Sequence, residues 1–242
     1  MQTDSQIEDI LQFGKLTPLG QFAYGSNYTF LVSVEHEGQT FNAVYKPQQG
    51  ERPLWDFPDG TLSQRERAAY LLSSALALDL VPPTILRPDA PFGSGSLQLF
   101  IEHDPNRHYF NLAPDQLEGL LPLAFFDLLA NNADRKGSHL LFRQADNHMF
   151  AIDHGLCFNA EPKLRTVIWN FAGKPIPRNL LKRLVPLTDF NSPLYQNGAA
   201  GLADLLSPSE LEALHGRAAA VLAQASFPFP PEDKRAYPYP PL

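Results

Sequence analysis

The sequence has very little cysteine, a deficit of basic residues and no long apolar run. Cys157 is the single cysteine, which excludes an internal disulfide framework and a cysteine-based zinc site. Lysine and arginine number 19 against 26 aspartates and glutamates, and the net charge of −7 argues against a broad surface for duplex nucleic acid or anionic lipid. No stretch approaches the roughly 18 uncharged apolar residues of a membrane span, and the first residues lack the basic flank and apolar run of a secretion signal. We therefore expect a cytoplasmic protein with no nucleic-acid partner and no stable membrane anchor.

The apolar content, in contrast, is ample. Hydrophobic residues make up 44% and aromatic residues 11% of the chain, which is enough for a core and excludes wholesale disorder. At 242 residues the chain has room for one large domain or for two small lobes. Its 23 prolines are about twice the usual share of about 5%, and six of them fall in the tail 227–242.

Strand and helix signals alternate along the chain. Apolar residues predict strands at 28–35 and 40–46, joined by a glycine-containing hairpin loop at 36–39. After a polar connection, Ser63 and Glu66 form a Ser-x-x-Glu capping box that predicts the start of a helix. The later signals predict, in order, a strand at 97–102, a helical stretch at 114–131 broken at Pro122, short strands at 139–142 and 148–152, and a helix to residue 224 opened by a second capping box, Ser207-Pro208-Ser209-Glu210.

This order of elements predicts an α+β fold of two lobes, because strands dominate the first half, helices dominate the second, and no βαβ series is found. We expect an antiparallel-sheet N-lobe, a mainly helical C-lobe and a hinge near residues 97–103. The predicted units are an N-terminal arm at 1–18, the N-lobe at 19–103, the C-lobe at 104–226 and an extended, proline-rich tail at 227–242.

Two acidic residues lie at loop positions where a carboxylate can serve chemistry. Asp134 lies in a polar loop between a predicted helix and a predicted strand, and Asp153 ends a strand two residues before Gly155. A strand end fixes the backbone and lets the carboxylate reach a neighbouring ligand, which suits a metal site. Each residue also has an ordinary interpretation, because Asp and Gly are common in solvated turns.

The spacing of these residues favours phosphoryl transfer. His139 follows Asp134 by five residues, and Asp153 follows across a short predicted hairpin. Kinases use an acid that orients the nucleophile, a metal ligand five residues later and a metal-binding acid after a hairpin. The sequence therefore predicts a phosphotransferase site in the second half of the chain.

The first half supplies candidate phosphate ligands. Lys46 ends a predicted strand, where a lysine can contact α- and β-phosphates, and Glu66 can pair with it or serve only as a helix cap. The small residues Gly25, Ser26 and Asn27 allow backbone amides to approach an anion.

These residues belong to a series of motifs in register. In order, they are Tyr24–Phe30 (YGSNYTF), Val44–Pro47 (VYKP), Arg65–Leu72 (RERAAYLL), Val81–Thr84 (VPPT), Leu97–Glu102 (LQLFIE), Asp134-Arg135 and Ala151–Leu156 (AIDHGL). The series resembles that of type II phosphatidylinositol 4-kinases, and the sequence is similar to a small bacterial-type member of the phosphatidylinositol 3/4-kinase-related family. The resemblance covers roughly residues 20–175.

The resemblance implies a two-lobed protein-kinase-like fold that binds ATP and Mg²⁺ or Mn²⁺ and transfers the γ-phosphate to a hydroxyl acceptor. Cofactor binding would fall to Gly25, Ser26, Asn27, Lys46, Glu66 and the hinge residues Gln98, Phe100 and Ile101. The catalytic loop would contribute Asp134 and Arg135, and the metal would be held by Asp153 and His139. The acceptor is left open between a lipid headgroup, a protein, a sugar and a small alcohol.

The chain also departs from the family at His139, where the family has asparagine. A neutral imidazole binds metals but favours zinc, copper or manganese over magnesium, so His139 could instead contact a phosphate, or the second metal site could be lost. The alternative function is therefore a weakly active or inactive pseudokinase that binds nucleotide as a regulatory module. A metallohydrolase site of His139, His148, His154 and Asp153 is a further alternative, although the chain has no His-Glu-x-x-His pair.

Overall fold

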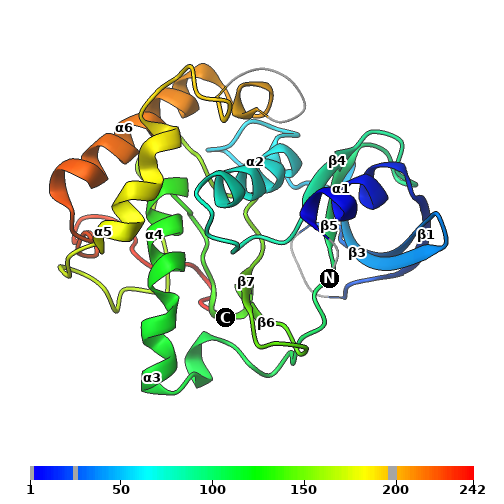
Figure 1. The fold of residues 1–242 in the computed structure, drawn as a ribbon, viewed down its shortest axis with the longest axis horizontal. Helices are drawn as coiled ribbons and strands as arrows, with labels where there is room; N and C mark the ends of the chain where they lie inside the picture. Colours follow the sequence, from blue (N-terminus) through cyan, green and yellow to red (C-terminus); the bar gives the residue numbers. More distant parts are fainter. Residues whose placement is uncertain (1–2, 24–26, 196–200) are drawn as a thin grey trace.

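The computed structural model describes residues 3–23, 27–195 and 201–242, which form two lobes side by side (Figure 1). The smaller lobe is built on an antiparallel sheet, and the larger lobe is mainly helical. The chain passes from the last strand of the sheet into the large lobe through residues 100–113. The predicted α+β architecture with a sheet lobe and a helical lobe is confirmed.

The small lobe has a five-stranded sheet in the order β1-β2-β3-β5-β4. Its strands are β1 (Lys15–Gln21), β2 (Phe30–His36), β3 (Gln39–Pro47), β4 (Thr84–Arg87) and β5 (Gly95–Leu99). The predicted hairpin is confirmed, since β2 and β3 pair antiparallel. Its loop residues Glu37 and Gly38 have φ of 47° and 75°, as a two-residue type I′ loop requires. The core of this lobe consists of Ile10, Leu11, Val32, Val34, Ala43, Tyr45, Ile85, Ala90 and Leu97.

The first residues of the chain belong to the small lobe. Helix α1 (Asp4–Phe13) starts at a capping box on Thr3, and it contacts β2, β4 and β5. The Leu11 carbonyl accepts a hydrogen bond from Arg87 Nη1 at 2.7 Å. The sequence predicts an arm over residues 1–18, and within it the structure places α1 against the sheet. Strand β1 is missed from the sequence because it is an edge strand with almost all side chains exposed, so it shows no apolar alternation.

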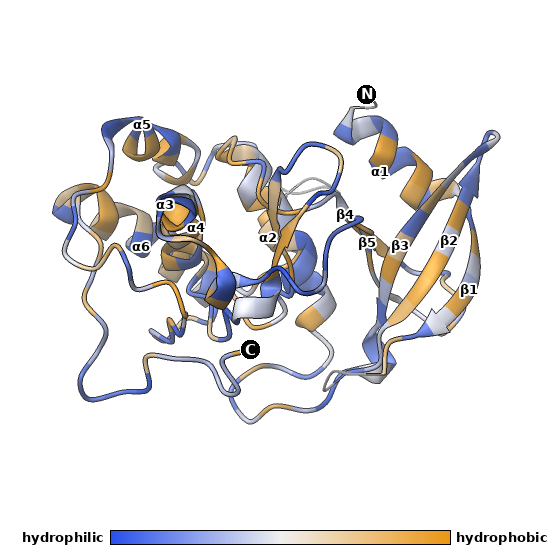
Figure 2. Ribbon diagram, turned by 90° about the horizontal axis from the view of Figure 1, so that it is seen from below, coloured by the Kyte–Doolittle hydropathy of each residue, from blue (hydrophilic) through white to orange (hydrophobic). Residues whose placement is uncertain are grey.

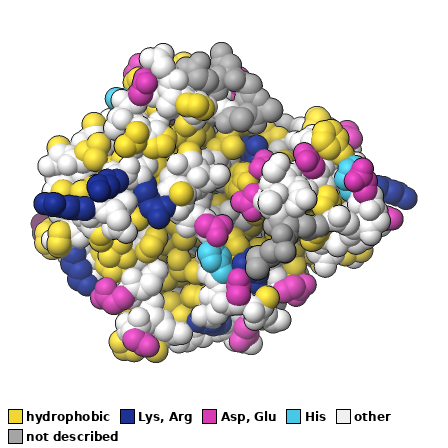
Figure 3. Space-filling model, viewed as in Figure 1, with side chains coloured by type: hydrophobic (Ala, Val, Ile, Leu, Met, Phe, Trp, Pro, Cys, Tyr) yellow, Lys and Arg dark blue, Asp and Glu magenta, His cyan; other side chains and the backbone are white. Residues whose placement is uncertain are grey.

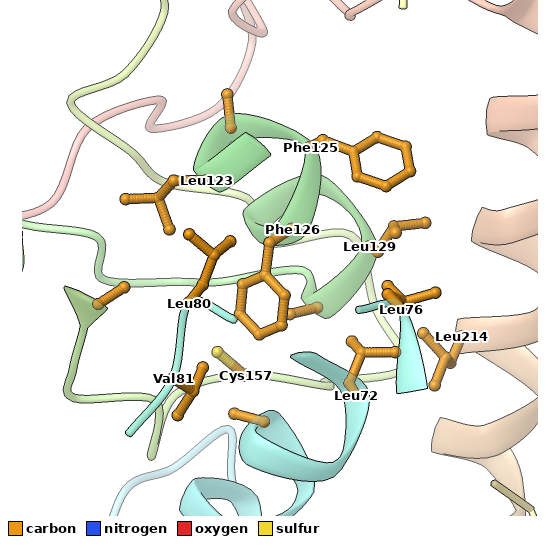
Figure 4. Close-up of a cluster of buried hydrophobic side chains, with 14 of the residues drawn as sticks. Leu72, Leu76, Leu80, Val81, Leu123, Phe125, Phe126, Leu129, Cys157 and Leu214 are labelled. Carbon is orange, nitrogen blue, oxygen red and sulfur yellow. The ribbon is translucent and has the colours of Figure 1, made fainter. Parts of the chain in front are cut away.

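Helix α2 (Leu62–Ala75) joins the two lobes. It contacts β4 and β5 of the sheet, while Leu72 and Leu76 enter the core of the large lobe (Figure 4). The capping box predicted on Ser63 and Glu66 is wrong. The helix begins at Leu62, and the side chain of the N-cap residue, Thr61, accepts no hydrogen bond from the backbone amides of the first turn. The Glu51 carboxylate instead accepts from the amides of Leu62 and Ser63 at 3.1 and 2.9 Å.

The large lobe surrounds α4 (Leu121–Ala130), the most buried helix of this half. Phe125, Phe126 and Leu129 of α4 meet side chains of α2 and α6 (Figure 4). The predicted break near Pro122 is confirmed, since a 3₁₀ turn at Glu118–Leu120 separates α4 from a preceding short helix. The other elements are α3 (Pro114–Leu117), β6 (Leu140–Phe142), β7 (Met149–Ala151), α5 (Arg178–Leu181) and α6 (Pro208–Gln224).

The proline-rich tail lies along the large lobe. Phe227 and Ala236 are buried, and the Ala236 carbonyl accepts from the amide of Thr166 at 3.1 Å. Near the end of the chain, the Pro241 carbonyl accepts from the amide of Gly137 at 2.8 Å. Both views place the C-terminus near the middle of the molecule (Figures 1 and 2). The tail is thus extended, as predicted, but bonded to the lobe.

Apolar residues line the interior of both lobes, and orange stretches run along β2, β3 and α1 (Figure 2). Within the described ranges, no helix has the length and apolar character needed to cross a bilayer.

Candidate active site

Three charged side chains from three elements meet between the lobes. Lys46 comes from the end of β3, Glu66 from α2, and Asp153 from the loop after β7. Lys46 Nζ forms ion pairs with Glu66 Oε1 and, at 3.1 Å, with Asp153 Oδ1. Figure 3 shows charged side chains among apolar ones on one face of the molecule, with a histidine near the middle of that face. The lysine and glutamate predicted as a pair are therefore in contact, together with the predicted metal-binding acid.

The charges in this group support one another. Burial disfavours a charged lysine, but the carboxylates of Asp153 and Glu66 outweigh it and raise the pKa of Lys46 above its ordinary value. The same attraction to Lys46 holds the pKa of Asp153 well below its usual range. Lys46 is therefore a cation and Asp153 a carboxylate throughout the neutral pH range.

Asp153 has a backbone conformation that few L-residues adopt. Its φ of 61° lies in the left-handed region, where a side chain other than glycine is disfavoured. The neighbouring peptide groups hold it there: the Ile152 carbonyl accepts from Arg135 Nη1 at 2.9 Å, and the amide of His154 donates to Glu66 Oε2 at 3.0 Å. The Asp153 side chain stays 50% exposed, so its carboxylate is accessible to a ligand.

The loop that carries Asp134 is anchored on a buried acid. Asp127 of α4 accepts from Asn132 Nδ2 at 3.0 Å, and Asn132 Oδ1 accepts from the Asp134 amide at 2.9 Å. The Asp134 carboxylate is 23% exposed and lies 3.3 Å from Lys136 Nζ. Burial raises the pKa of Asp134 to about 6, although the Lys136 ammonium opposes the shift. Asp134 thus has the titration range of a general base.

Arg135 lies beneath this loop rather than at its surface. Its guanidinium is fully buried, and Nε bonds both carboxylate oxygens of Asp127 at 3.2 and 2.9 Å. The same group donates to the Ile152 carbonyl and to the His154 ring. The resemblance implies a catalytic role, but a wholly enclosed guanidinium touches no substrate. We therefore assign Arg135 to positioning Asp134.

His139 is adjacent to Asp153. Its Nε2 lies 3.2 Å from Asp153 Oδ2, and its Nδ1 accepts from the amide of Lys136 at 3.4 Å. This arrangement places the proton on Nε2, which donates to the carboxylate. Burial lowers the pKa of His139 to about 4, so the ring is neutral at pH 7.

The donor set fits a divalent cation that also binds phosphates. Asp153 offers carboxylate oxygens, which magnesium and manganese prefer, and a neutral His139 suits manganese. For Nε2 of His139 to bind the ion, the ring proton would move to Nδ1. No group of three or more His, Cys, Asp or Glu side chains in metal-binding geometry occurs in the described part of the chain, so an ion held by Asp153 and His139 would need phosphate and water oxygens as further ligands.

The metallohydrolase alternative is not supported by this geometry. His154 is bonded to Arg135 at 2.7 Å, and His148 bonds the Asp79 carbonyl at 2.7 Å. Neither ring is therefore directed at the Asp153 carboxylate.

The predicted hinge residues have different environments. Gln98 is buried and donates to Thr84 Oγ1 at 2.8 Å, so its side chain is committed to the sheet. The Phe100 amide donates to the Asn42 carbonyl at 2.9 Å. Ile101 packs with Leu141 and Phe150; across the described ranges its amide has no hydrogen-bond acceptor.

Of the three predicted phosphate-loop residues, Gly25 and Ser26 lie outside the described residues. Asn27 Oδ1 accepts from the Arg52 amide at 2.9 Å, which ties Asn27 to the connection after β3. A cavity of about 200 Å³ lies along this connection, between Gln48 and Leu62, and none of the predicted site residues lines it.

Comparison with known sequences identifies the family. The sequence model of phosphatidylinositol 3- and 4-kinases matches residues 62–192. Protein Rv2133c of Mycobacterium tuberculosis (strain ATCC 25618 / H37Rv) is 39% identical over 267 aligned residues, which cover 96% of this chain and 94% of the relative. The chain belongs to the phosphatidylinositol 3- and 4-kinase family. The predicted family membership is thereby confirmed.

Solved kinase structures share the fold of this family member. The Golgi casein kinase with Mn/ADP bound matches with a TM-score of 0.61 at 16% identity, over 92% of this chain and 75% of the other. Hydra Fam20 with sugar matches with a TM-score of 0.55 at 17% identity, over 91% and 88%. At these identities the likeness establishes a protein-kinase-like fold, as predicted.

The supporting contacts of several residues at this kinase-like site are not predicted from the sequence. Asp127, Asn132 and His154 hold the catalytic loop from below, and Glu51 caps α2. Asp127 has a visible signal, because it is the single acid in the apolar run of α4 and a buried acid needs a partner. His154 and Glu51 have no comparable signal, since both act on residues distant in the sequence.

Proposed function

We propose that this family member is an ATP-dependent phosphotransferase that transfers the γ-phosphate to a hydroxyl acceptor. The observation that carries the proposal is the contact of Lys46 with both Glu66 and Asp153. Kinases require a lysine–glutamate ion pair and a metal-binding acid to be in place together. The family and fold, both those of kinases, support the same chemistry.

Each residue of the site has a role in this reaction. Lys46 binds the α- and β-phosphates, and the free amide of Ile101 donates to the adenine. Asp153, with His139, would hold Mg²⁺ or Mn²⁺, which neutralises charge on the phosphates when bound. Asp134 orients the acceptor hydroxyl and takes its proton as the new oxygen–phosphorus bond forms. The bond between the γ-phosphorus and the β–γ bridging oxygen breaks, and ADP leaves.

A nucleotide-binding pseudokinase is the second candidate, and His139 is the observation that favours it. Its Nε2 donates to Asp153 Oδ2, so the second metal position that asparagine provides in the family is occupied by an internal hydrogen bond. A protein of this kind would bind ATP without transferring its phosphate.

Turnover and binding measurements on matched variants test both candidates. We expect ATP with Mn²⁺ or Mg²⁺ to raise the melting temperature of the wild-type protein, and we expect ATP to be consumed. Asp153→Asn should abolish both the metal-dependent shift and the turnover. Asp146→Asn is the control, because Asp146 pairs with Arg143 on the surface and should change neither.

The outcomes separate the candidates. Stabilisation by ATP without metal dependence and without turnover, including of the protein itself as acceptor, would establish the pseudokinase. A protein that ATP does not stabilise at all would rule out both functions.

A further inference from the structure

His154 is a buried histidine between the catalytic loop and α2. It follows Asp153 directly and is fully buried. On one side, its Nε2 lies 2.7 Å from Arg135 Nη2. On the other side, its backbone amide donates to Glu66 Oε2 at 3.0 Å, and its Nδ1 lies 4.0 Å from the same oxygen. The residue therefore contacts the groups that support both Asp134 and Lys46.

The contact with Arg135 determines the tautomer of the ring. A guanidinium has donors and no acceptor, so Nε2 of His154 must accept and the ring proton must lie on Nδ1. Nδ1 is buried, and no hydrogen-bond partner for it exists among the described residues. The nearest counter-charge is the Glu66 carboxylate, which the Nδ1–H dipole faces. Burial and the neighbouring Arg135 charge both lower the pKa of His154 well below its ordinary value, which keeps this ring neutral.

Beyond Arg135 the network reaches the catalytic loop on both sides of Asp134. Arg135 bonds both oxygens of Asp127. Asp127 accepts from Asn132, and Asn132 accepts from the amide of Asp134. In the other direction, Glu66 pairs with Lys46. His154 joins these two halves, because its ring accepts from Arg135 and its backbone amide donates to Glu66.

A filler role alone does not account for this arrangement. The His154 ring packs edge-on against Phe126 at 5.5 Å between centroids, and a phenylalanine could occupy the same space. Arg135 Nη2 donates both to Asp127 Oδ1, at 3.0 Å, and to His154. A phenylalanine would leave the second of these N–H groups without an acceptor, and a buried unpaired donor is costly. The residue therefore connects the two halves through one ring atom, Nε2, which accepts from Arg135, and through its backbone amide, which donates to Glu66.

We propose that His154 is a positioning residue that couples the catalytic loop at Asp134 to the Lys46–Glu66 pair through its hydrogen bond from Arg135. The coupling rests on the proposed phosphotransferase function, because it sets two groups of that site in register.

Three variants test the coupling. His154→Phe keeps the aromatic packing and removes the acceptor, and we expect a folded protein with a lowered melting temperature in which kcat falls about tenfold or more. His154→Gln keeps an acceptor for Arg135, and we expect kcat within about threefold of the wild type. His148→Gln is the surface control. The KM for ATP should change little in His148→Gln and His154→Gln. In His154→Phe it should rise, because the Lys46–Glu66 pair that contacts the phosphates loses its register. An unchanged kcat in His154→Phe, or equal losses in the phenylalanine and glutamine variants, would overturn the proposal.

Two further measurements do not depend on turnover. In ¹⁵N-histidine spectra, the signal that His154→Gln removes should have a protonated Nδ1 and an unprotonated Nε2; a protonated Nε2 would overturn the proposal. Amide exchange should accelerate at Asp134 and in the first turns of α2 together in His154→Phe but not in His154→Gln. If the wild type consumes no ATP, the phosphotransferase function fails, and these two results alone decide whether the coupling exists.

Discussion

Asp134 is the residue whose titration should govern the pH dependence of the reaction. Its pKa is raised to about 6 by burial, so the carboxylate that accepts the proton is present above that pH and is lost below it. We expect kcat/KM to rise with pH, by about tenfold per unit below pH 6, and to level off above it. The profile is measured with ATP and Mn²⁺ between pH 4.5 and 8, a range chosen to span the rise.

Lys136 gives this prediction an internal check. Its ammonium lies 3.3 Å from Asp134 and lowers the carboxyl pKa, so Lys136→Met should move the rise to higher pH. Lys163→Met is the matched control. Lys163 pairs with Asp56 at 3.0 Å, and its charge is not among those that shift the pKa of Asp134. A profile that does not move in Lys136→Met would mean that another group produces the rise.

At the scale of elements, α2 depends on a cap from outside its own sequence. The Glu51 carboxylate accepts from the amides of Leu62 and Ser63, which would otherwise lack partners at the helix start. We expect Glu51→Ala to lower the free energy of unfolding by about 0.5–2 kcal/mol, as measured by urea denaturation. Ser63→Ala should have a smaller effect, because the Ser63 side chain does not cap the helix. A larger loss of stability in Ser63→Ala than in Glu51→Ala would instead support the capping box that the sequence pattern predicts.

The C-terminal tail is the second element with a testable contribution. Ala236 accepts from the amide of Thr166 and from Trp169 Nε1, both at 3.1 Å, and Pro241 accepts from the amide of Gly137. Truncation after Lys234 should therefore speed hydrogen exchange at Thr166 and Gly137 and lower the melting temperature. Tyr239→Ala is the control, since that side chain is 81% exposed. Unchanged exchange at Gly137 would show that the tail does not stabilise the catalytic loop.

For the whole molecule, the buried pair of Arg65 and Glu210 links α2 to α6 at 2.5 Å. Arg65 also donates to the Cys157 carbonyl at 2.8 Å. Arg65→Met would leave the Glu210 charge buried without its cation, and we expect a loss of about 3–5 kcal/mol in unfolding free energy. Adding Glu210→Gln should recover part of this loss, because the amide keeps the α6 capping box without the charge. A double variant as unstable as the sum of the two single variants would contradict the pairing.

Sequence reasoning reaches furthest where the signal is local. The β2–β3 hairpin and the Ser207 capping box are confirmed because each depends on residues a few positions apart. The sequence predicts the pairing of Lys46 with Glu66, whereas it gives no sign of the contact between Lys46 and Asp153. Strand β1 was missed because an exposed edge strand needs no apolar alternation. The burial of Arg135 was missed because a charged residue beside a catalytic acid gives no sign of facing inward.

The sequence by itself determined the order of the lobes, the spacing of Asp134, His139 and Asp153, and the excess of acidic over basic side chains. Only the tertiary structure decided what those residues contact. Lys46 and Asp153 are 107 positions apart, and their pairing exists because β3 and the loop after β7 come together between the lobes. The same folding buries Arg135, which the resemblance places in the catalytic loop, and His154, a candidate metal ligand of the metallohydrolase alternative. Hydrogen bonds and desolvation act over a few ångströms in space, so these roles follow from the packing and not from the spacing.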